Sequence, residues 1–183
     1  MQEINYQMYG NSIKPSEATG ELKKLYDELE ELLGEIMPHI QLHATYMLED
    51  MDCFINPMKL TRNHPEIPLL WFVLMRLYVA YKEDFPYCKA LNERMLEKLG
   101  IDSKTKNAYI KDSNQAPLKD REILLLKKAI KSIYDSHNFN KEDFNQLYEV
   151  GYSDKTIYEI IVYSTGFSGI ARRLNTYLIK EKG

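Results

Sequence analysis

Apolar residues recur at intervals of three and four along most of the chain, with polar residues between them. The clearest stripe runs between residues 20 and 34 and consists of leucines and one tyrosine: Leu22, Leu25, Tyr26, Leu29, Leu32 and Leu33. Such a stripe, with charged residues on the opposite face, is typical of an amphipathic helix. No stretch shows the sustained alternation of β-branched residues that indicates a strand. The pattern therefore predicts an all-α protein.

Capping residues, glycine and proline indicate where the early helices begin and end. Thr19 can cap the first helix, and Gly34 can end it. Residues 38–63 support one or two further helices, because Pro57 either kinks the second helix or restarts it. The most apolar helix is expected after Pro65.

The later half of the chain also shows a helical pattern, which one polar segment interrupts. A helix is predicted from Asp84 to Gly100, with Asp84 as its cap and Pro86 in its first turn. Residues 101–117 are polar, and we expect a loop there that joins two helical groups. Three helices follow, so the prediction is a single domain over residues 1–183, a bundle of about seven to eight helices.

Composition and charge exclude several classes of partner. A chain of 183 residues with 44% hydrophobic content can bury the core of one domain. A net charge of −3 provides no broad basic surface, so we expect no nucleic-acid partner. The most apolar run, Ile67–Tyr81, contains Arg76 and is shorter than the ~20 residues that cross a bilayer, so we expect no membrane partner. The N-terminal residues lack the pattern of a secretory signal, and a cytoplasmic protein with reduced Cys53 and Cys88 is expected.

Cys88 is the residue with the clearest claim to chemistry. It follows the predicted start of a helix, where unpaired N–H groups and the helix dipole favour a thiolate. Pro86 removes one of these N–H groups, and Glu83 and Asp84 add negative charge that opposes ionisation. Lys89 partly offsets that charge. The residues leave open whether Cys88 is a reactive thiol or a small side chain packed in a helical core.

The spacing around Cys88 is that of a thiol redox helix with missing parts. A C-x-x-C-x-x-x-H helix supplies an attacking thiol, a resolving thiol and a base on adjacent turns. At the matching offsets this chain has Phe85 and Asn92. The resolving thiol and the base are therefore both absent from the motif.

Three segments resemble the alkylhydroperoxidase D (AhpD)-like group of the carboxymuconolactone decarboxylase family. "EATGELKKLYDELEELLG" is similar to the opening helix of the group, and "YCKALNERMLEKLGI" resembles its reactive helix from the second cysteine onward. The C-terminal helices carry the most specific piece, L-x-x-x-G-[FY]-S-D-x-x-I-x-E-I, over Leu147–Ile160. The resemblance implies an AhpD-like helical bundle, peroxide chemistry at a thiol, and assembly into a homo-oligomer.

The resemblance also assigns roles to positions of this chain. The cysteine that attacks the peroxide matches Cys88, and the resolving cysteine matches Phe85. The histidine of the proton relay matches Asn92, and its glutamate falls near Val73. Arg172 matches the arginine of the last helix. Among the thiol and proton-relay positions, only Cys88 keeps a competent group.

Two functions follow as hypotheses. In the first, Cys88 attacks a hydroperoxide beside Tyr87 and Asn92, and an external thiol reductant regenerates it. In the second, the fold persists without peroxidase chemistry, as an oligomeric protein that binds a small ligand or a partner. A lyase reaction like that of the decarboxylase branch ranks last, because Asn92 cannot act as a base at neutral pH.

Other polar residues have simpler explanations. His39 and His43 could share a helix face as metal ligands with Glu49 or Asp50, but no cluster of cysteine and histidine supports such a site, and we expect no metal and no cofactor.

Cys53 would act as a remote resolving thiol only if packing brought it to Cys88. Arg76 needs either a carboxylate partner or an anionic ligand, and His64 and His137 are expected in polar turns.

Overall fold

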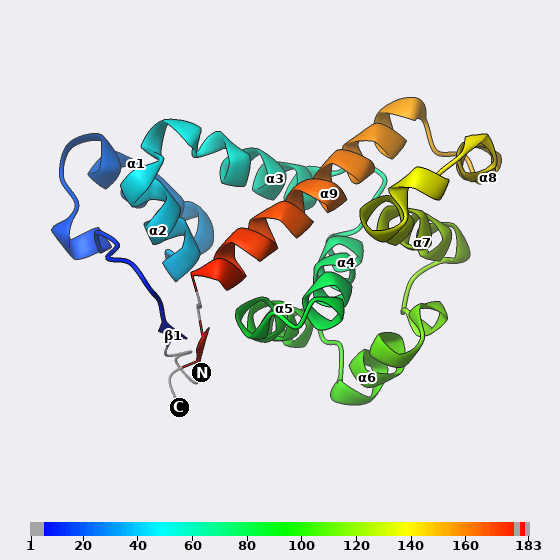
Figure 1. Ribbon diagram of the computed structural model, residues 1–183, viewed down its shortest axis with the longest axis horizontal. Helices are drawn as coiled ribbons and strands as arrows, with labels where there is room; N and C mark the ends of the chain where they lie inside the picture. The colour runs from blue at the N-terminus through cyan, green and yellow to red at the C-terminus, as the bar shows by residue number, and fades with distance from the viewer. Residues whose placement is uncertain (1–5, 178–179, 182–183) are drawn as a thin grey trace. The chain divides into compact units, whose positions relative to one another are not determined.

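The computed structural model describes residues 6–177 and 180–181, and helices dominate them (Figure 1). These residues form nine α-helices, α1 (Gly20–Leu33), α2 (Pro38–Tyr46), α3 (Asp52–Asn63), α4 (Leu69–Lys82), α5 (Pro86–Lys98), α6 (Ser103–Lys111), α7 (Asp120–Tyr134), α8 (Lys141–Glu149) and α9 (Asp154–Thr176). Short 3-10 turns lie before α1 and between some of the later helices: η1 (Pro15–Glu17), η2 (Leu48–Asp50), η3 (Ser113–Gln115) and η4 (Ser136–Asn138). The all-α prediction is confirmed, with slightly more helices than predicted.

Two very short strands are the exception to the helical pattern. β1 (Tyr6–Gln7) and β2 (Lys180–Glu181) pair antiparallel, with Tyr6 opposite Glu181. A backbone hydrogen bond of 3.0 Å from Tyr9 N–H to the Tyr177 carbonyl continues this contact. The two ends of the described chain are therefore joined by main-chain hydrogen bonds.

The chain divides into two compact units. The first unit comprises residues 1–62 and 174–183, and the second comprises residues 63–173. The division lies near the end of α3 and within the last turn of α9, away from the polar segment 101–117. That all residues form a single domain stays a prediction.

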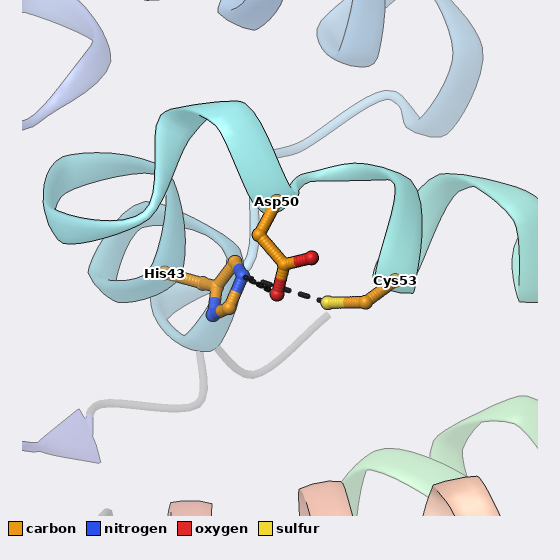
Figure 2. A group of neighbouring side chains, drawn as sticks. All are labelled: His43, Asp50 and Cys53. Carbon is orange, nitrogen blue, oxygen red and sulfur yellow. Dashed lines mark hydrogen bonds and ion pairs between the residues drawn. The ribbon is translucent and has the colours of Figure 1, made fainter.

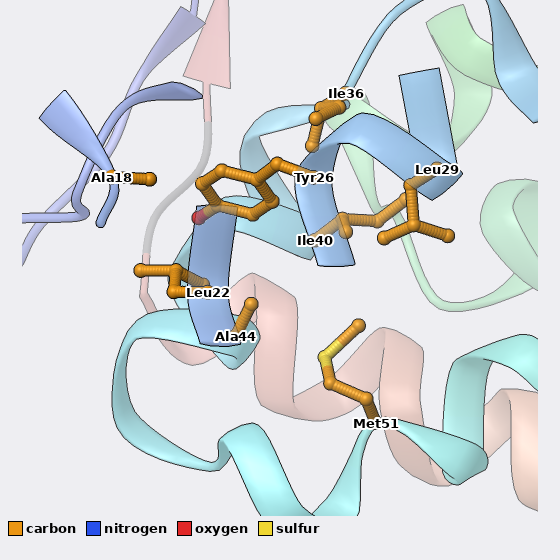
Figure 3. Close-up of a cluster of buried hydrophobic side chains, with 8 residues drawn as sticks. All are labelled: Ala18, Leu22, Tyr26, Leu29, Ile36, Ile40, Ala44 and Met51. Carbon is orange, nitrogen blue, oxygen red and sulfur yellow. The ribbon is translucent and has the colours of Figure 1, made fainter. Parts of the chain in front are cut away.

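The first unit has its own apolar core, drawn in Figure 3. Leu22, Tyr26 and Leu29, which the sequence placed on one apolar stripe of α1, are buried in this core together with Ile40 of α2. Leu32, the position expected to extend the stripe, is 43% exposed near the end of the helix. The polar tip of Tyr26 is satisfied because its hydroxyl donates a hydrogen bond of 2.9 Å to the Ile13 carbonyl.

The ends of the first two long helical segments test the expected boundaries. α1 ends at Gly34, which adopts a left-handed conformation with φ 79° and closes the helix onto the Glu30 carbonyl, as expected. Thr19 occupies the N-cap position, but its side chain makes no capping hydrogen bond. α3 continues through Pro57 as one helix, so the proline does not restart it.

The second unit is organised around α4, which is buried along most of its length as predicted. Its fully buried side chains include Trp71, Phe72, Leu74 and Met75, and each contributes roughly 1.5–3 kcal/mol by leaving water. Trp71 Nε1 donates a hydrogen bond of 3.0 Å to a backbone carbonyl of α7, that of Glu122. α5 and α7 pack against α4.

The polar segment 101–117 is not an uninterrupted loop, because its middle forms α6. Asp102 caps this helix by accepting a hydrogen bond of 2.7 Å from the Thr105 backbone. Tyr109 anchors it, since its side chain is fully buried and its hydroxyl donates a 2.8 Å hydrogen bond to the Leu74 carbonyl. One cap and one aromatic anchor hold a helix that the apolar pattern does not reveal.

Among the described residues, no helix combines the length and apolar character that crossing a membrane requires.

Candidate functional site

The turn between α4 and α5 positions Cys88. Asp84 adopts a left-handed conformation with φ 53°, and the Phe85 N–H donates a hydrogen bond of 2.9 Å to the Ala80 carbonyl. Phe85 is the N-cap of α5 and Pro86 is its first residue, so the expected cap at Asp84 is wrong. The left-handed turn moves the cap one residue further along the chain. Cys88 is the third residue of α5 and is only 4% exposed.

Burial controls the ionisation of Cys88. Removal from water raises the pKa of the Cys88 thiol to about 12, although the positive charge of Arg76 acts in the opposite direction. At pH 7 such a thiol is ionised in about one molecule in 100,000. The favourable position at a helix start is therefore outweighed by desolvation, and the resting thiol is neutral.

Lys89, expected to offset the nearby carboxylates, is engaged on the surface. Its ammonium group pairs with Asp84 and lies 5.1 Å from the ring centroid of Tyr81. Its hydrogen bond to Asp84 lowers the pKa of that carboxyl. Lys89 and Asp84, which sequence reasoning expected to influence Cys88, therefore pair with each other outside the buried site.

Arg76 lies at the centre of a hydrogen-bond network that includes Asn92, the residue that the resemblance matched to a histidine. Arg76 Nε donates to Asn92 Oδ1 at 2.9 Å, and its Nη1 donates to the Tyr163 hydroxyl at 3.2 Å. Nη2 lies 3.2 Å from Met95 Sδ. Asn92, 2% exposed, donates from Nδ2 to the Cys88 carbonyl at 2.8 Å. Both ends of the Asn92 amide are therefore engaged, and it offers no base to the thiol.

Arg76 carries a charge that no carboxylate balances within residues 8–177, the part whose side chains the structure describes. Its partners are an amide, a phenol and a thioether, all of them neutral at pH 7. The sequence left two explanations open for Arg76, a carboxylate partner or an anionic ligand. The described residues provide no carboxylate partner. A partly buried cation with neutral partners favours binding of an anion.

Phe85 and Tyr87 line the same helix start. They are 4% and 3% exposed, so both contribute to the core next to Cys88. Phe85 is the residue that the resemblance matched to a resolving thiol, and Val73, near the position matched to a glutamate, is fully buried. Both positions therefore hold apolar side chains in this chain.

Arg172 lies on the surface of the second unit rather than in the Arg76 network. Its Nη2 is 2.7 Å from Glu83 Oε1, and its side chain is 55% exposed. The hydrogen bond from Arg172 lowers the pKa of Glu83. Arg172 therefore holds the carboxylate that follows the last residue of α4.

His64 is a turn residue, as expected, but its side chain is only 1% exposed. Its Nδ1 accepts hydrogen bonds from the backbone N–H groups of Glu66 and Ile67 at 3.2 and 3.1 Å. Its Nε2 lies 3.6 Å from Glu159 Oε2, and burial lowers the pKa of this histidine. These contacts shape the turn that leads into α4.

A second group of reactive side chains lies in the first unit, where sequence reasoning did not assemble it (Figure 2). His43 Nε2 is 3.5 Å from Cys53 Sγ and 3.7 Å from Asp50 Oδ2. Sequence reasoning considered His43 together with His39 and with Glu49 or Asp50, but it did not include Cys53 among the possible ligands. The signal that could have found the group is local, because histidine, aspartate and cysteine fall close together across one break between helices.

Comparisons with known proteins identify the fold. No family model matches the chain, and no curated protein matches its sequence. A solved structure from Ralstonia eutropha JMP134, described as an "alkylhydroperoxidase AhpD core: uncharacterized peroxidase-related protein", matches with a TM-score of 0.77 and 16% identity. An "uncharacterized peroxidase-related protein" from Silicibacter sp. TM1040 matches with a TM-score of 0.75 and 16% identity. Each match covers 100% of this chain and 94% of the other. The chain has the AhpD-like fold.

Proposed function

We propose that this protein keeps the AhpD-like fold without hydroperoxide chemistry at Cys88, and that it binds a small anionic ligand at Arg76. The observation that carries the proposal is the Arg76 guanidinium, which is partly buried and is held, among the residues that the structure describes, by neutral partners only. Membership of the carboxymuconolactone decarboxylase family and assembly into a homo-oligomer are part of the same proposal.

The loss of peroxidase chemistry follows from what the thiol requires. A thiol attacks a peroxide as its thiolate, and a base and a second thiol complete the cycle. Burial keeps Cys88 protonated, while Phe85 and Asn92 provide neither the second thiol nor the base. Because members of a catalytic group act as a unit, loss of several together leaves little activity.

The choice of an anion follows from the donors of Arg76. A guanidinium has five N–H donors, and the contacts to Asn92, Tyr163 and Met95 occupy one on each nitrogen. Two donors are left, which suits a carboxylate or phosphate group. The bonds to Asn92 and Tyr163 fix the plane of the guanidinium, so the ligand would meet an oriented donor pair rather than a mobile side chain.

Calorimetric titration with inorganic phosphate and with small mono- and dicarboxylates tests the proposal. At least one of these anions should bind the wild-type protein, and Arg76→Met should abolish binding. Arg76→Lys keeps the charge and should restore part of the affinity. Arg172→Met is the matched control, because it removes an exposed arginine outside this network. No binding by any of these anions, or equal losses in the Arg76 and Arg172 variants, would overturn the proposal.

One observation supports the one-cysteine thiol oxidoreductase as a second candidate. The charge of Arg76 lowers the pKa of Cys88, even though burial outweighs it. In that reaction Cys88 sulfur bonds to the terminal peroxide oxygen, the O–O bond breaks, and an alcohol leaves with the proton. Two equivalents of an external thiol then reduce the sulfenic acid to the thiol, with release of a disulfide and water. Peroxide-dependent thiol oxidation that disappears in Cys88→Ser would favour this candidate over the first.

A further inference from the structure

The first unit brings together three side chains of kinds that bind metal ions, from three successive elements (Figure 2). His43 lies on α2, Asp50 ends η2, and Cys53 is in the first turn of α3. One nitrogen, one oxygen and one sulfur atom of these residues all lie within 4.8 Å of one another. Their donor atoms converge from both sides of the break between α2 and α3.

The side chains of Cys53 and Asp50 converge on one nitrogen of His43. Cys53 Sγ and Asp50 Oδ2 both approach the same atom, His43 Nε2, at 3.5 and 3.7 Å. That nitrogen carries at most one proton, so it cannot donate a well-aligned hydrogen bond to both partners. A cation placed between the three atoms could be coordinated by all of them together.

The distances fit a tetrahedral ion of the zinc class. Typical Zn–S and Zn–N bond lengths place ligand sulfur and nitrogen about 3.6 Å apart in a tetrahedron, and nitrogen and oxygen about 3.4 Å apart. The observed 3.5 and 3.7 Å differ from these spacings by only a few tenths of an ångström. The third pair, Cys53 sulfur and an Asp50 carboxylate oxygen, lies within 4.8 Å.

The surrounding structure orients the histidine and the turn. The His43 ring packs edge-on against Phe54, with ring centroids 4.7 Å apart, and Phe54 is buried. Met51, between Asp50 and Cys53, is 4% exposed and anchors the turn in the core of the first unit. Ligands held by packing lose less freedom on binding a metal.

The ligand set also indicates which metal and what kind of site. Imidazole nitrogen and thiolate sulfur favour Zn²⁺ over the oxygen-binding Mg²⁺ and Ca²⁺. The His43 side chain is 11% exposed, whereas that of Asp50 is 55% exposed, so the site is closed on the histidine side and open on the aspartate side. Three protein ligands with an open side leave the fourth position to water or to a small ligand.

We propose that His43, Asp50 and Cys53 form a three-ligand site for Zn²⁺, with the fourth position open to solvent. Binding would release the proton of the Cys53 thiol, so affinity rises with pH. The site belongs to the first unit and does not depend on Cys88 or Arg76, which lie in the second.

Titration of the metal-free full-length protein with Co²⁺ and Zn²⁺ tests this site. We expect one equivalent of Co²⁺ to give tetrahedral visible bands and a thiolate charge-transfer band, and Zn²⁺ to displace it. Cys53→Ser should abolish the charge-transfer band and weaken Zn²⁺ binding at least about 100-fold, and Asp50→Asn should weaken it to a lesser extent. Cys88→Ser and Glu49→Gln are matched controls and should bind as the wild type does.

A second measurement uses the unaltered chain, in case a variant folds poorly. Zn²⁺ should slow alkylation of Cys53, identified by peptide mass spectrometry, and a chelator should restore the rate. Failure of the wild type to bind one equivalent of Zn²⁺ would overturn the site. So would a charge-transfer band that survives in Cys53→Ser but vanishes in Cys88→Ser.

Discussion

Alkylation of Cys88 in the folded protein should be much slower than in the unfolded chain. A pKa of about 12 instead of the unperturbed ~8.5 lowers the thiolate fraction at pH 8 by about three orders of magnitude. The more basic thiolate is a better nucleophile, which recovers between about one and two of these orders. The net expectation is a rate at least about 50-fold below that of the denatured protein.

The assay is the rate of iodoacetamide modification of Cys88 between pH 7 and 10, with peptide mass spectrometry to separate it from Cys53. The same protein in denaturant gives the reference rate for an unburied Cys88. A Cys53→Ala variant removes the second thiol as a control. A Cys88 that titrates below ~8.5 in the folded protein would refute the reasoning from burial. It would favour the thiol oxidoreductase over the anion-binding protein.

The same pKa predicts a loss of stability at high pH. Because the folded pKa of Cys88 is raised, its contribution is complete below ~8.5 and declines as the pH rises towards about 12. The slope approaches about 1.4 kcal/mol of unfolding free energy per pH unit. Urea unfolding of Cys88→Ala should show a decline shallower by that amount between pH 9 and 10, and identical slopes would contradict the prediction.

Three further predictions concern stability and assembly. Burial raises the pKa of Asp143, but hydrogen bonds from two lysines of α7 outweigh it and lower the pKa to about 2. Its contribution of about 2 kcal/mol should therefore be lost as the pH falls from 3.8 towards 2 in urea titrations, and Asp143→Asn should flatten that dependence. Tyr109→Phe should cost about 1 kcal/mol of unfolding free energy through the lost hydrogen bond to Leu74, whereas Tyr158→Phe on the exposed face of α9 should cost nothing measurable in the same denaturation assay. Tyr158 and Val162 lie one turn apart on α9 and are 71% and 50% exposed, so they form an apolar surface that a second copy of the chain could cover. If the protein is a homo-oligomer, Val162→Asp should shift it to smaller species in light scattering. A monomeric wild type would exclude the oligomer.

Sequence periodicity predicted the helices whose stability comes from an apolar face. The stripe of α1 and the continuous apolar run of α4 are recognisable because burial requires that composition over several turns. α6 was not predicted because it is a polar helix with a single buried residue, Tyr109. Its first turn is stabilised by the Asp102 cap. A helix held by one anchor and one cap has little periodic signal.

The candidate site was predictable in its parts but not in its electrostatics. Residue spacing identified Cys88, Phe85 and Asn92 as neighbours on one helix. The neutral partners of Arg76 depend on packing of helices distant in the chain, since Tyr163 lies 87 positions from it. The depth of burial that fixes the Cys88 pKa arises from the same packing, so no local pattern encodes it.

The pairing of β1 with β2 has a consequence for the order in which the protein can fold during synthesis. Residues 1–62 leave the ribosome well before residues 174–183, although both segments belong to the same unit. The second unit, residues 63–173, is complete in the nascent chain before the first can close. Bringing together the ends of a flexible segment of that length costs about 4 kcal/mol of chain entropy. If the second unit folds first, the segment is already compact, and this entropic cost of closing the first unit is smaller. The first unit can therefore be completed only after the whole of the second unit has been synthesised.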